Sequence, residues 1–278
     1  MIARRSTARS ALIGAGAWAI LLWSAAPFIW QMSTSFQEDK ALMASTPSFW
    51  PSPLTFEHYY NVFAVKHFQL YVVNSIIVAG LTTLFCLAVG ALAAFSLSRL
   101  RIRQRFGILN MILSVSMFPQ IALVGPLYLL AADLGLLDTY ASLVITYVAL
   151  GVPLVTWVLF GYFEALPREL DEAARMDGIG PIGLLIRIII PLSGPALVTT
   201  GLLAFIAAWN EFMFALAFTS TAEHQTIPVG IANFTNLYYV PWGDVAAASV
   251  VVTGPLIVLV LFFQRHIIEG LTQGAVKE

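Results

Sequence analysis

Long apolar runs constrain the fold of this chain more than any other feature. Such runs occupy residues 11–30, 71–98, 106–132, 139–163, 192–218 and 245–264. A helix needs roughly 20 apolar residues to cross a bilayer, and it satisfies its own backbone hydrogen bonds there. Of the 278 residues, 59% are hydrophobic and only 10% are charged, whereas soluble proteins have about 25% charged residues. The sequence therefore predicts an all-α polytopic membrane protein with six transmembrane helices.

The first apolar run could instead be the core of a cleaved signal peptide, because Arg4, Arg5 and Arg9 precede it. Its length exceeds the roughly 7–15 residues of such a core, so we predict a retained span. The residues that follow, up to 70, are rich in Ser, Pro and aromatic residues and predict an irregular external loop with short helices at most. The expected division is an anchor span and external loop (1–70), a transmembrane core (71–268) and a tail (269–278).

Basic residues predict the orientation in the membrane. The N-terminus, residues 99–105, residues 164–192 and the C-terminus hold twelve of the fourteen Lys and Arg residues. Only Lys40 and Lys66 lie on the other side. Because cytoplasmic segments carry the excess of Lys and Arg, we expect both termini and residues 164–192 to be cytoplasmic.

Composition and motifs argue against several function classes. The net charge of −1 indicates no nucleic-acid partner, and the single cysteine, Cys86, excludes an internal disulfide. The four histidines do not have metal-ligand spacing, and the sequence contains no phosphate-binding G-x-x-x-x-G-K-[ST] loop. We therefore predict a non-catalytic chain with no metal site and no cofactor of its own.

Residues 164–192 interrupt the apolar runs with five carboxylates and three arginines. The segment predicts two short helices joined at Gly178, which can adopt the left-handed conformation that ends a helix. Pro167 suits a first helical position, and the acidic residues after it favour a helix N-terminus. Pro181 would begin the second helix, and Pro191 would mark a break before the next span.

The first of these helices should carry an apolar stripe of Leu166, Leu170, Ala173 and Ala174, with alanines that allow close approach of another surface. An amphipathic helix lying on the membrane is the alternative interpretation. Its excess of acidic residues argues against this, since the cytoplasmic leaflet attracts Lys and Arg. The pattern therefore favours docking to another protein.

The same segment carries a family resemblance. Glu172-Ala173-Ala174, three residues, Gly178, nine residues and then Ile188-Ile189-Ile190-Pro191 resemble the EAA loop of ABC importer permeases. That resemblance implies a type I importer permease fold and a coupling contact with an ATPase subunit. The residues implied in the contact are Glu169, Glu172, Ala173, Ala174, Asp177, Gly178 and Pro191.

Glu211 is the one carboxylate well inside a predicted span. A charge at the centre of a membrane helix costs about 2.5–3.5 kcal/mol, so it should face protein or a watery pathway. Trp209 and Asn210 beside it offer a ring and an amide for a sugar, and Asn74 is a weaker candidate. An interhelical hydrogen bond that stabilises the bundle is the alternative role for these groups.

A further polar segment, residues 219–244, mixes amides, hydroxyls and aromatic rings on the predicted external side. It would suit contact with a sugar or its carrier protein through Asn233, Phe234, Thr235 and Asn236. For Tyr239 and Trp242, near a span end, an interfacial aromatic belt is the favoured interpretation.

Taken over nearly its whole length, the chain is similar to the smaller permease subunit of carbohydrate ABC importers of the maltose and trehalose type. Residues 242–249 (WGDVAAAS) and 270–277 (GLTQGAVK) carry this likeness beside the EAA-like loop. It implies a bacterial or archaeal cytoplasmic membrane and three kinds of partner: a second homologous permease, two ATPase subunits that bind ATP and Mg, and an external sugar-binding protein. It also implies that Thr272, Gln273 and Gly274 contact the ATPase. The Asn210–Glu211 pair is only partly shared with the maltose permease, which leaves the sugar open.

An ATP-independent secondary transporter or channel is the alternative class. It would be expected to carry several charged residues within its spans, and the sequence has one. A membrane enzyme would need convergent catalytic residues, and none is apparent.

Overall fold

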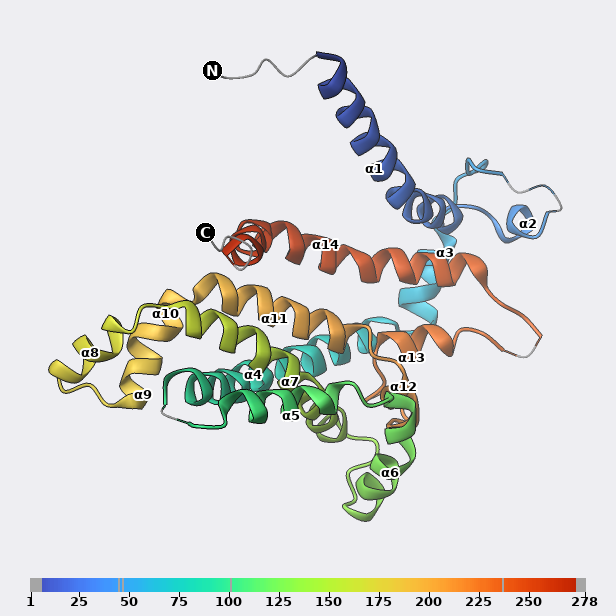
Figure 1. The fold of residues 1–278 in the computed structure, drawn as a ribbon. Helices are drawn as coiled ribbons and strands as arrows, with labels where there is room; N and C mark the ends of the chain where they lie inside the picture. Colours follow the sequence, from blue (N-terminus) through green and yellow to red (C-terminus); the bar gives the residue numbers. More distant parts are fainter. Residues whose placement is uncertain (1–6, 45, 47, 101, 237, 274–278) are drawn as a thin grey trace. The chain divides into compact units, whose positions relative to one another are not determined.

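The computed structural model describes residues 7–44, 46, 48–100, 102–236 and 238–273, and their side chains between residues 11 and 265. The described part is built from helices and has no strand, which confirms the all-α prediction (Figure 1). In chain order the helices are α1 (Thr7–Ser35), α2 (Asp39–Leu42), α3 (Glu57–Tyr60), η1 (Asn61–Val65), α4 (Gln69–Arg99), α5 (Arg105–Ser116), α6 (Gln120–Asp133), α7 (Tyr140–Ala165), α8 (Glu169–Met176), α9 (Pro181–Leu184), η2 (Leu185–Ile189), α10 (Ile190–Leu192), α11 (Gly194–Trp209), α12 (Met213–Phe218), α13 (Ile227–Ala232) and α14 (Trp242–Gln273).

Four helices of the described part are individually long and apolar enough to cross a membrane: α1, α4, α7 and α14. Two further candidates are bent pairs. Residues Arg105–Ser116 and Gln120–Asp133 meet at 86°, and Pro181–Leu192 and Gly194–Trp209 meet at 84°. The predicted count of six is therefore reached only if each bent pair forms one span.

The apolar run 106–132 does not form the single helix that its hydropathy predicted. It breaks between α5 and α6, where Pro119 adopts an extended conformation with φ −60° and ψ 116°. Proline lacks a backbone N–H, and its ring disfavours a helical conformation for the preceding residue, Phe118. The prediction followed hydropathy and overlooked this proline.

The run 192–218 is also interrupted. Helix α11 ends at Trp209, and α12 begins only at Met213. Among the residues described between α1 and α4, by contrast, the short helices α2, α3 and η1 are the only helices, as the composition of that loop predicted.

Two compact units make up the chain. One contains residues Met1–Phe68 and Ile231–Gly254, and the other contains Gln69–Gly230 and Pro255–Glu278. The division into residues 1–70, 71–268 and 269–278 stays a prediction.

In the second unit, α4, α7 and α11 pack against one another and α5 packs on α7 (Figure 1). Small residues allow this close approach. A Cβ atom on Gly90 of α4 would lie 2.5 Å from Cγ1 of Val155 on α7, and one on Gly151 would lie 2.9 Å from the Cys86 sulfur. Membrane helices generally use small residues in this way, because backbones must come close to gain packing energy in lipid.

We expect Gly90→Ala to lower the stability of the protein by about 1–3 kcal/mol, because its methyl group would overlap Val155. Thermal unfolding in detergent micelles measures this. Gly80→Ala is the matched control, since a Cβ there meets nothing within 4 Å. Alanine favours a helix by about 1 kcal/mol over glycine, so the control should be neutral or more stable. Equal effects of the two substitutions would contradict the packing argument.

Candidate functional site

The EAA-like segment forms two helical pieces joined by a turn, as predicted. Gly178 has φ +71°, the left-handed conformation expected at the end of α8. Pro181 begins α9 after Gly180, which is also as predicted. Pro167 is not the first helical residue, since α8 begins at Glu169. Pro191 lies within the short helix α10, and the chain turns after it, at Ser193.

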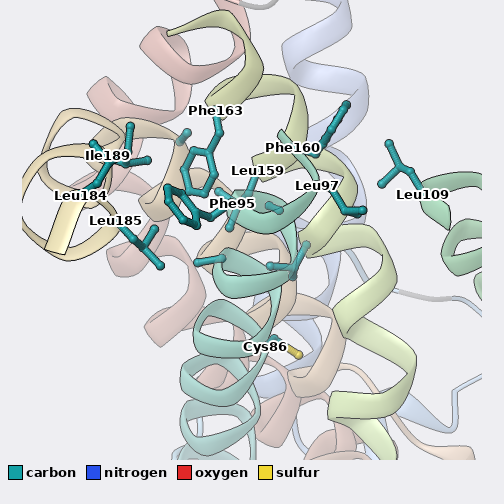
Figure 2. Packing of buried hydrophobic residues seen from close by; sticks show 14 of the residues in the cluster. Cys86, Phe95, Leu97, Leu109, Leu159, Phe160, Phe163, Leu184, Leu185 and Ile189 are labelled. Atoms are coloured by element: carbon teal, nitrogen blue, oxygen red, sulfur yellow. The ribbon is translucent and has the colours of Figure 1, made fainter. Parts of the chain in front are cut away.

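The inner side of this segment is part of a hydrophobic core shared with α4 and α7. Figure 2 shows Phe95 and Phe163 close to the side chains that α9 and η2 contribute. Ala174 is 1% exposed and Ile189 is fully buried. The core also includes Leu184 and Leu185. The spacing of the EAA-like pattern thus places an alanine and an isoleucine in one core.

The outer side of α8 has a different composition. Exposed residues recur at helical spacing along it: Glu169, Glu172, Ala173 and Met176. Met176 is 88% exposed, and Ile182 on α9 is 71% exposed. Asp177, Gly178 and Pro191 are exposed as well. This outer face combines carboxylates with uncovered apolar side chains.

The predicted apolar stripe of α8 is therefore wrong in part. Ala174 faces the core and Ala173 is exposed. Leu166 and Leu170 are half-buried, and Leu166 precedes the helix. Residues one position apart on a helix are rotated by about 100°, so neighbouring alanines need not share a face.

Arg99, the last residue of α4, fixes α8 to the two helices behind it. Its side chain is 1% exposed, and its Nη1 atom lies 3.3 Å from Oδ1 of Asp171. Its guanidinium also donates to the backbone carbonyls of Phe163 at 2.5 Å, Leu166 at 2.9 Å and Pro167 at 3.3 Å. These carbonyls lie at the C-terminal end of α7, where a helix lacks internal donors and attracts positive charge.

A second set of ion pairs surrounds this contact. Arg105 donates from Nη1 to both carboxylate oxygens of Glu164 at 3.0 Å. Arg168 donates to Glu164 at 3.2 Å and to the carbonyl of Ser98 at 2.7 Å. The ends of α4, α5 and α7 are thereby tied to the residues that enter α8.

Glu211 lies at the break between α11 and α12, where the sequence predicted the inside of a span. Its carboxylate accepts hydrogen bonds from the backbone N–H groups of Phe214 at 2.9 Å and Ala215 at 3.1 Å. The hydroxyl of Tyr147 on α7 also donates to it. Three donors on one carboxylate meet the requirement that a charge inside a membrane be satisfied by protein.

The other predicted pathway residues differ in exposure. Asn210 is exposed, and its side-chain amide donates to the carbonyl of Ile206 at 2.8 Å. Trp209 is only 2% exposed and stacks on Phe205, so its ring is not available to a sugar in this structure. That correction follows from its burial, which the hydropathy pattern did not predict.

Asn74 is 3% exposed and fully engaged within the protein. Its amide donates to the carbonyls of Ala222 at 3.0 Å and Gln225 at 2.8 Å, and its oxygen accepts from the Tyr140 hydroxyl at 2.7 Å. These bonds favour the alternative role of joining helices, and they leave no group to face a pathway.

The predicted external contact residues lie in the loop after α13. Asn236 shapes its tip, since the Asn236 side-chain oxygen accepts from the backbone N–H groups of Tyr238 at 3.0 Å and Tyr239 at 2.8 Å. Asn233 and Thr235 are exposed, and Phe234 is half-buried. Tyr238 is 97% exposed. The loop therefore presents amides, a hydroxyl and a phenol ring on one short turn.

The predicted tail contacts lie at the limit of the described chain. Helix α14 continues through Gln273, so Thr272 and Gln273 are helical. Gly274 lies outside the described residues. Among the residues described, no three His, Cys, Asp or Glu side chains lie together as metal ligands would.

Residues 86–273 match the model of a family described as "Binding-protein-dependent transport system inner membrane component". This chain belongs to that family. The match decides between the two transporter classes that the sequence left open, because it contradicts an ATP-independent secondary transporter or channel.

Individual members of the family show the extent of the likeness. The trehalose/maltose transport system permease protein MalG of Thermococcus litoralis is 48% identical over 259 residues, covering 90% of this chain and 91% of the relative. The trehalose transport system permease protein SugB of Mycobacterium tuberculosis is 38% identical, covering 90% and 92%. A chain in the crystal structure of a bacterial ABC transporter that imports the acidic polysaccharide alginate has a TM-score of 0.79 at 26% identity, covering 95% of this chain and 99% of that one.

Sequence reasoning missed Arg99, Asp171 and Tyr147 in this permease. Arg99 counted only toward orientation, and Asp171 only as an acidic residue near a helix start. The position of Arg99 at the end of a span could be read from the sequence, whereas its burial and its pairing with Asp171 could not. The partnership of Tyr147 with Glu211 had no local signal.

We expect Arg99→Met to destabilise the permease by about 3–5 kcal/mol, because it leaves the carboxylate of Asp171 without its buried cation. Thermal unfolding of the purified chain measures this. Arg99→Met combined with Asp171→Leu should recover part of the loss, since no unpaired charge remains. Arg103→Met is the matched control, because Arg103 lies in the segment that follows α4 and has an exposed side chain. An equal loss in the single and double variants would contradict the importance of the ion pair.

Proposed function

We propose that this chain is the permease subunit of an ATP-driven sugar importer, and that α8 and α9 transmit the motion of an ATPase to the membrane helices. The observation that carries this proposal is the two-sided α8–α9 segment. Its inner side is fixed by Arg99 and the shared core, and its outer side is uncovered.

The outer face suits a protein partner of defined chemistry. Glu169, Glu172 and Asp177 provide negative charge, while Met176 and Ile182 provide exposed apolar contact. A partner cleft with an apolar floor and a basic rim would complement this surface. In an importer that partner is the nucleotide-binding subunit, which binds ATP and Mg, and two copies would serve the two permeases.

Orientation follows from the basic residues. Segments 99–105 and 164–192 are rich in arginine, so α8 and α9 face the cytoplasm together with both termini. In Figure 1, α8 and α9 lie at one end of α4, α7 and α11, and α12 lies near the other end. The loop after α13 would then be extracytoplasmic. The end of α14, with Thr272 and Gln273, would be near the ATPase subunits.

Transport would proceed by alternating access. Closure of the ATPase dimer would move α8. Because Arg99 joins α8 to α4 and α7, these two helices would move together with α8. A second, homologous permease would complete the pathway. Binding of ATP and release of sugar are coupled because both bias the same two-state bundle.

The pathway role of the break at residues 210–212 rests on exposure. Asn210 offers an exposed amide to the pathway. Glu211 accepts a hydrogen bond from the first turn of α12 and so stabilises the break between α11 and α12. A sugar presents many hydroxyl groups that donate and accept, and an amide matches both.

The substrate class is a carbohydrate. The relatives are named for trehalose and maltose, trehalose, and diacetylchitobiose, and the related solved transporter imports alginate. The 48% identity with the trehalose/maltose permease favours an α-linked disaccharide. A panel of labelled sugars, transported by the reconstituted complex, tests this directly.

We expect Glu172→Lys to abolish coupling while the chain still folds, because Glu172 is exposed and its reversal would oppose a basic partner. Losing a paired interface charge costs about 2 kcal/mol or more, so sugar-stimulated ATPase activity should fall at least about tenfold. Gly178→Val should act similarly by straining a backbone with φ +71°. Asp133→Lys, at an exposed acid that ends α6, is the control. Normal ATPase stimulation in both α8 variants would contradict the docking proposal.

The loop after α13 would contact the external sugar-binding protein and compete with the bound sugar. Asn233, Phe234, Thr235 and Asn236 are the groups that could replace the sugar's own contacts. Replacement of residues 232–237 by a Gly-Ser linker should therefore leave basal ATPase activity intact and raise sugar retention by the binding protein in a vanadate-trapped complex. Retention equal to that of the unmodified complex would mean that the loop only connects helices.

A further inference from the structure

A buried histidine in the first unit is surrounded by acceptors. His58 is 3% exposed, its Nδ1 atom lies 2.8 Å from Oδ1 of Asp244, and its Nε2 atom lies 2.8 Å from the carbonyl oxygen of Gln37. A carbonyl oxygen and an ionised carboxylate can only accept hydrogen bonds. Both ring nitrogens must therefore donate, which requires the protonated imidazolium.

The neighbouring glycine shows how closely this arrangement is packed. A Cβ atom on Gly243 would lie 2.1 Å from Cε1 and Nε2 of the His58 ring. No side chain fits there without displacing the histidine. At the start of α14, Gly243 therefore leaves room for the His58 ring, and Asp244 pairs with it.

Asp244 connects the histidine to the external loop. Its second carboxylate oxygen lies 3.2 Å from Nζ of Lys66. That ammonium group lies 4.2 Å from the centroid of the Phe234 ring, which it faces as a cation–π pair. Phe234 also packs edge to face on Phe68, with centroids 5.6 Å apart. His58 is thus connected to the loop by a series of direct contacts through Asp244, Lys66 and Phe234.

The remaining charged and titratable groups of this cluster favour the same protonation state. Oδ1 of Asp39 lies 3.9 Å from Nε2 of His58. The hydroxyl of Tyr239, in the loop, donates to the other oxygen of Asp39 at 3.1 Å. Two carboxylates therefore face the imidazolium, and the cation Lys66 pairs with the second oxygen of Asp244.

We propose that protonated His58 is a positioning residue for the loop around Phe234, acting through Asp244 and Lys66, so that the placement of this loop depends on pH. The importance of this for transport rests on the proposed function, in which the same loop contacts the sugar-binding protein. Loss of the proton would leave one ring nitrogen as an acceptor facing another acceptor. The carboxylate of Asp244 is the stronger acceptor, so the neutral ring would keep its proton on Nδ1 and leave Nε2 facing the carbonyl oxygen of Gln37. Asp244 would then lose the positive charge beside it, and the packing that holds this carboxylate against Lys66 would loosen.

The direction of the pH dependence follows from linkage. The hydrogen bond from His58 to Asp244 raises the pKa of the imidazole above its ordinary 6.5, against the opposing effect of burial, and the Gln37 carbonyl adds to the rise. A group with a raised folded pKa stabilises the fold fully at low pH, and the stabilisation is lost as pH rises through the folded pKa. The loop should therefore be ordered in acid and released in the range above 6.5.

A spin label at the loop tip would test the proposal in the assembled importer in lipid. Tyr238→Cys provides the site, since Tyr238 is 97% exposed, while Cys86 is fully buried and should not react. From about pH 5 to about pH 8 the label should become more mobile, with a midpoint above the ordinary histidine value. In His58→Gln and Lys66→Met the label should be mobile throughout. His67→Asn is the matched control, because His67 is exposed and has φ 49°, which asparagine tolerates.

Two results would overturn the proposal: a label whose mobility does not change with pH, or an unchanged titration in His58→Gln. If His58→Gln fails to assemble, Lys66→Met decides, since it leaves the buried histidine in place. Affinity for the sugar-binding protein, measured over the same pH range, separates this inference from the proposed function. A label that titrates while that affinity stays constant would support the His58 contacts and contradict the role of the loop in docking.

Discussion

The arrangement of α8 and α9 depends on one buried guanidinium. Arg99 donates to the carbonyls of Phe163, Leu166 and Pro167 at the end of α7, and its charge is balanced by Asp171. Burying a charge is costly unless it is paired and hydrogen-bonded, and a guanidinium with five donors can meet several acceptors at once. The same contact therefore ends α7, fixes the start of α8 and joins both to α4.

This contact explains how a short polar segment can be held in a fixed place. Isolated helices shorter than about 12 residues are marginal in water, so α8 and α9 owe their order to what lies behind them. Ala174 and Ile189 enter the shared core, and Glu172 and Met176 remain uncovered. A segment that is rigid on one side and open on the other suits a transmitter of motion in a binding-protein-dependent permease.

Two further polar side chains of the second unit are also hydrogen-bonded within the protein. Glu211 receives three donors and Asn74 makes three hydrogen bonds, so both stabilise the positions of chain breaks and loops. Asn210 differs, because its side chain is exposed. Among these three residues, exposure therefore distinguishes Asn210 from the two that stabilise the surrounding structure.

Local signals in the sequence determined the helical membrane class, the short helices after α1, the turn at Gly178 and the family pattern of α8, because hydropathy, glycine, proline and spacing act over one or two turns. The helix break at Pro119 could also be predicted from the sequence, although hydropathy alone indicated one continuous helix. Only the tertiary structure decided which alanine of α8 faces the core, that Trp209 is buried, and that Arg99 meets Asp171 at a separation of 72 positions and His58 meets Asp244 at 186. Such contacts depend on which helices pack together, and apolar spans of similar composition carry no local information about their neighbours.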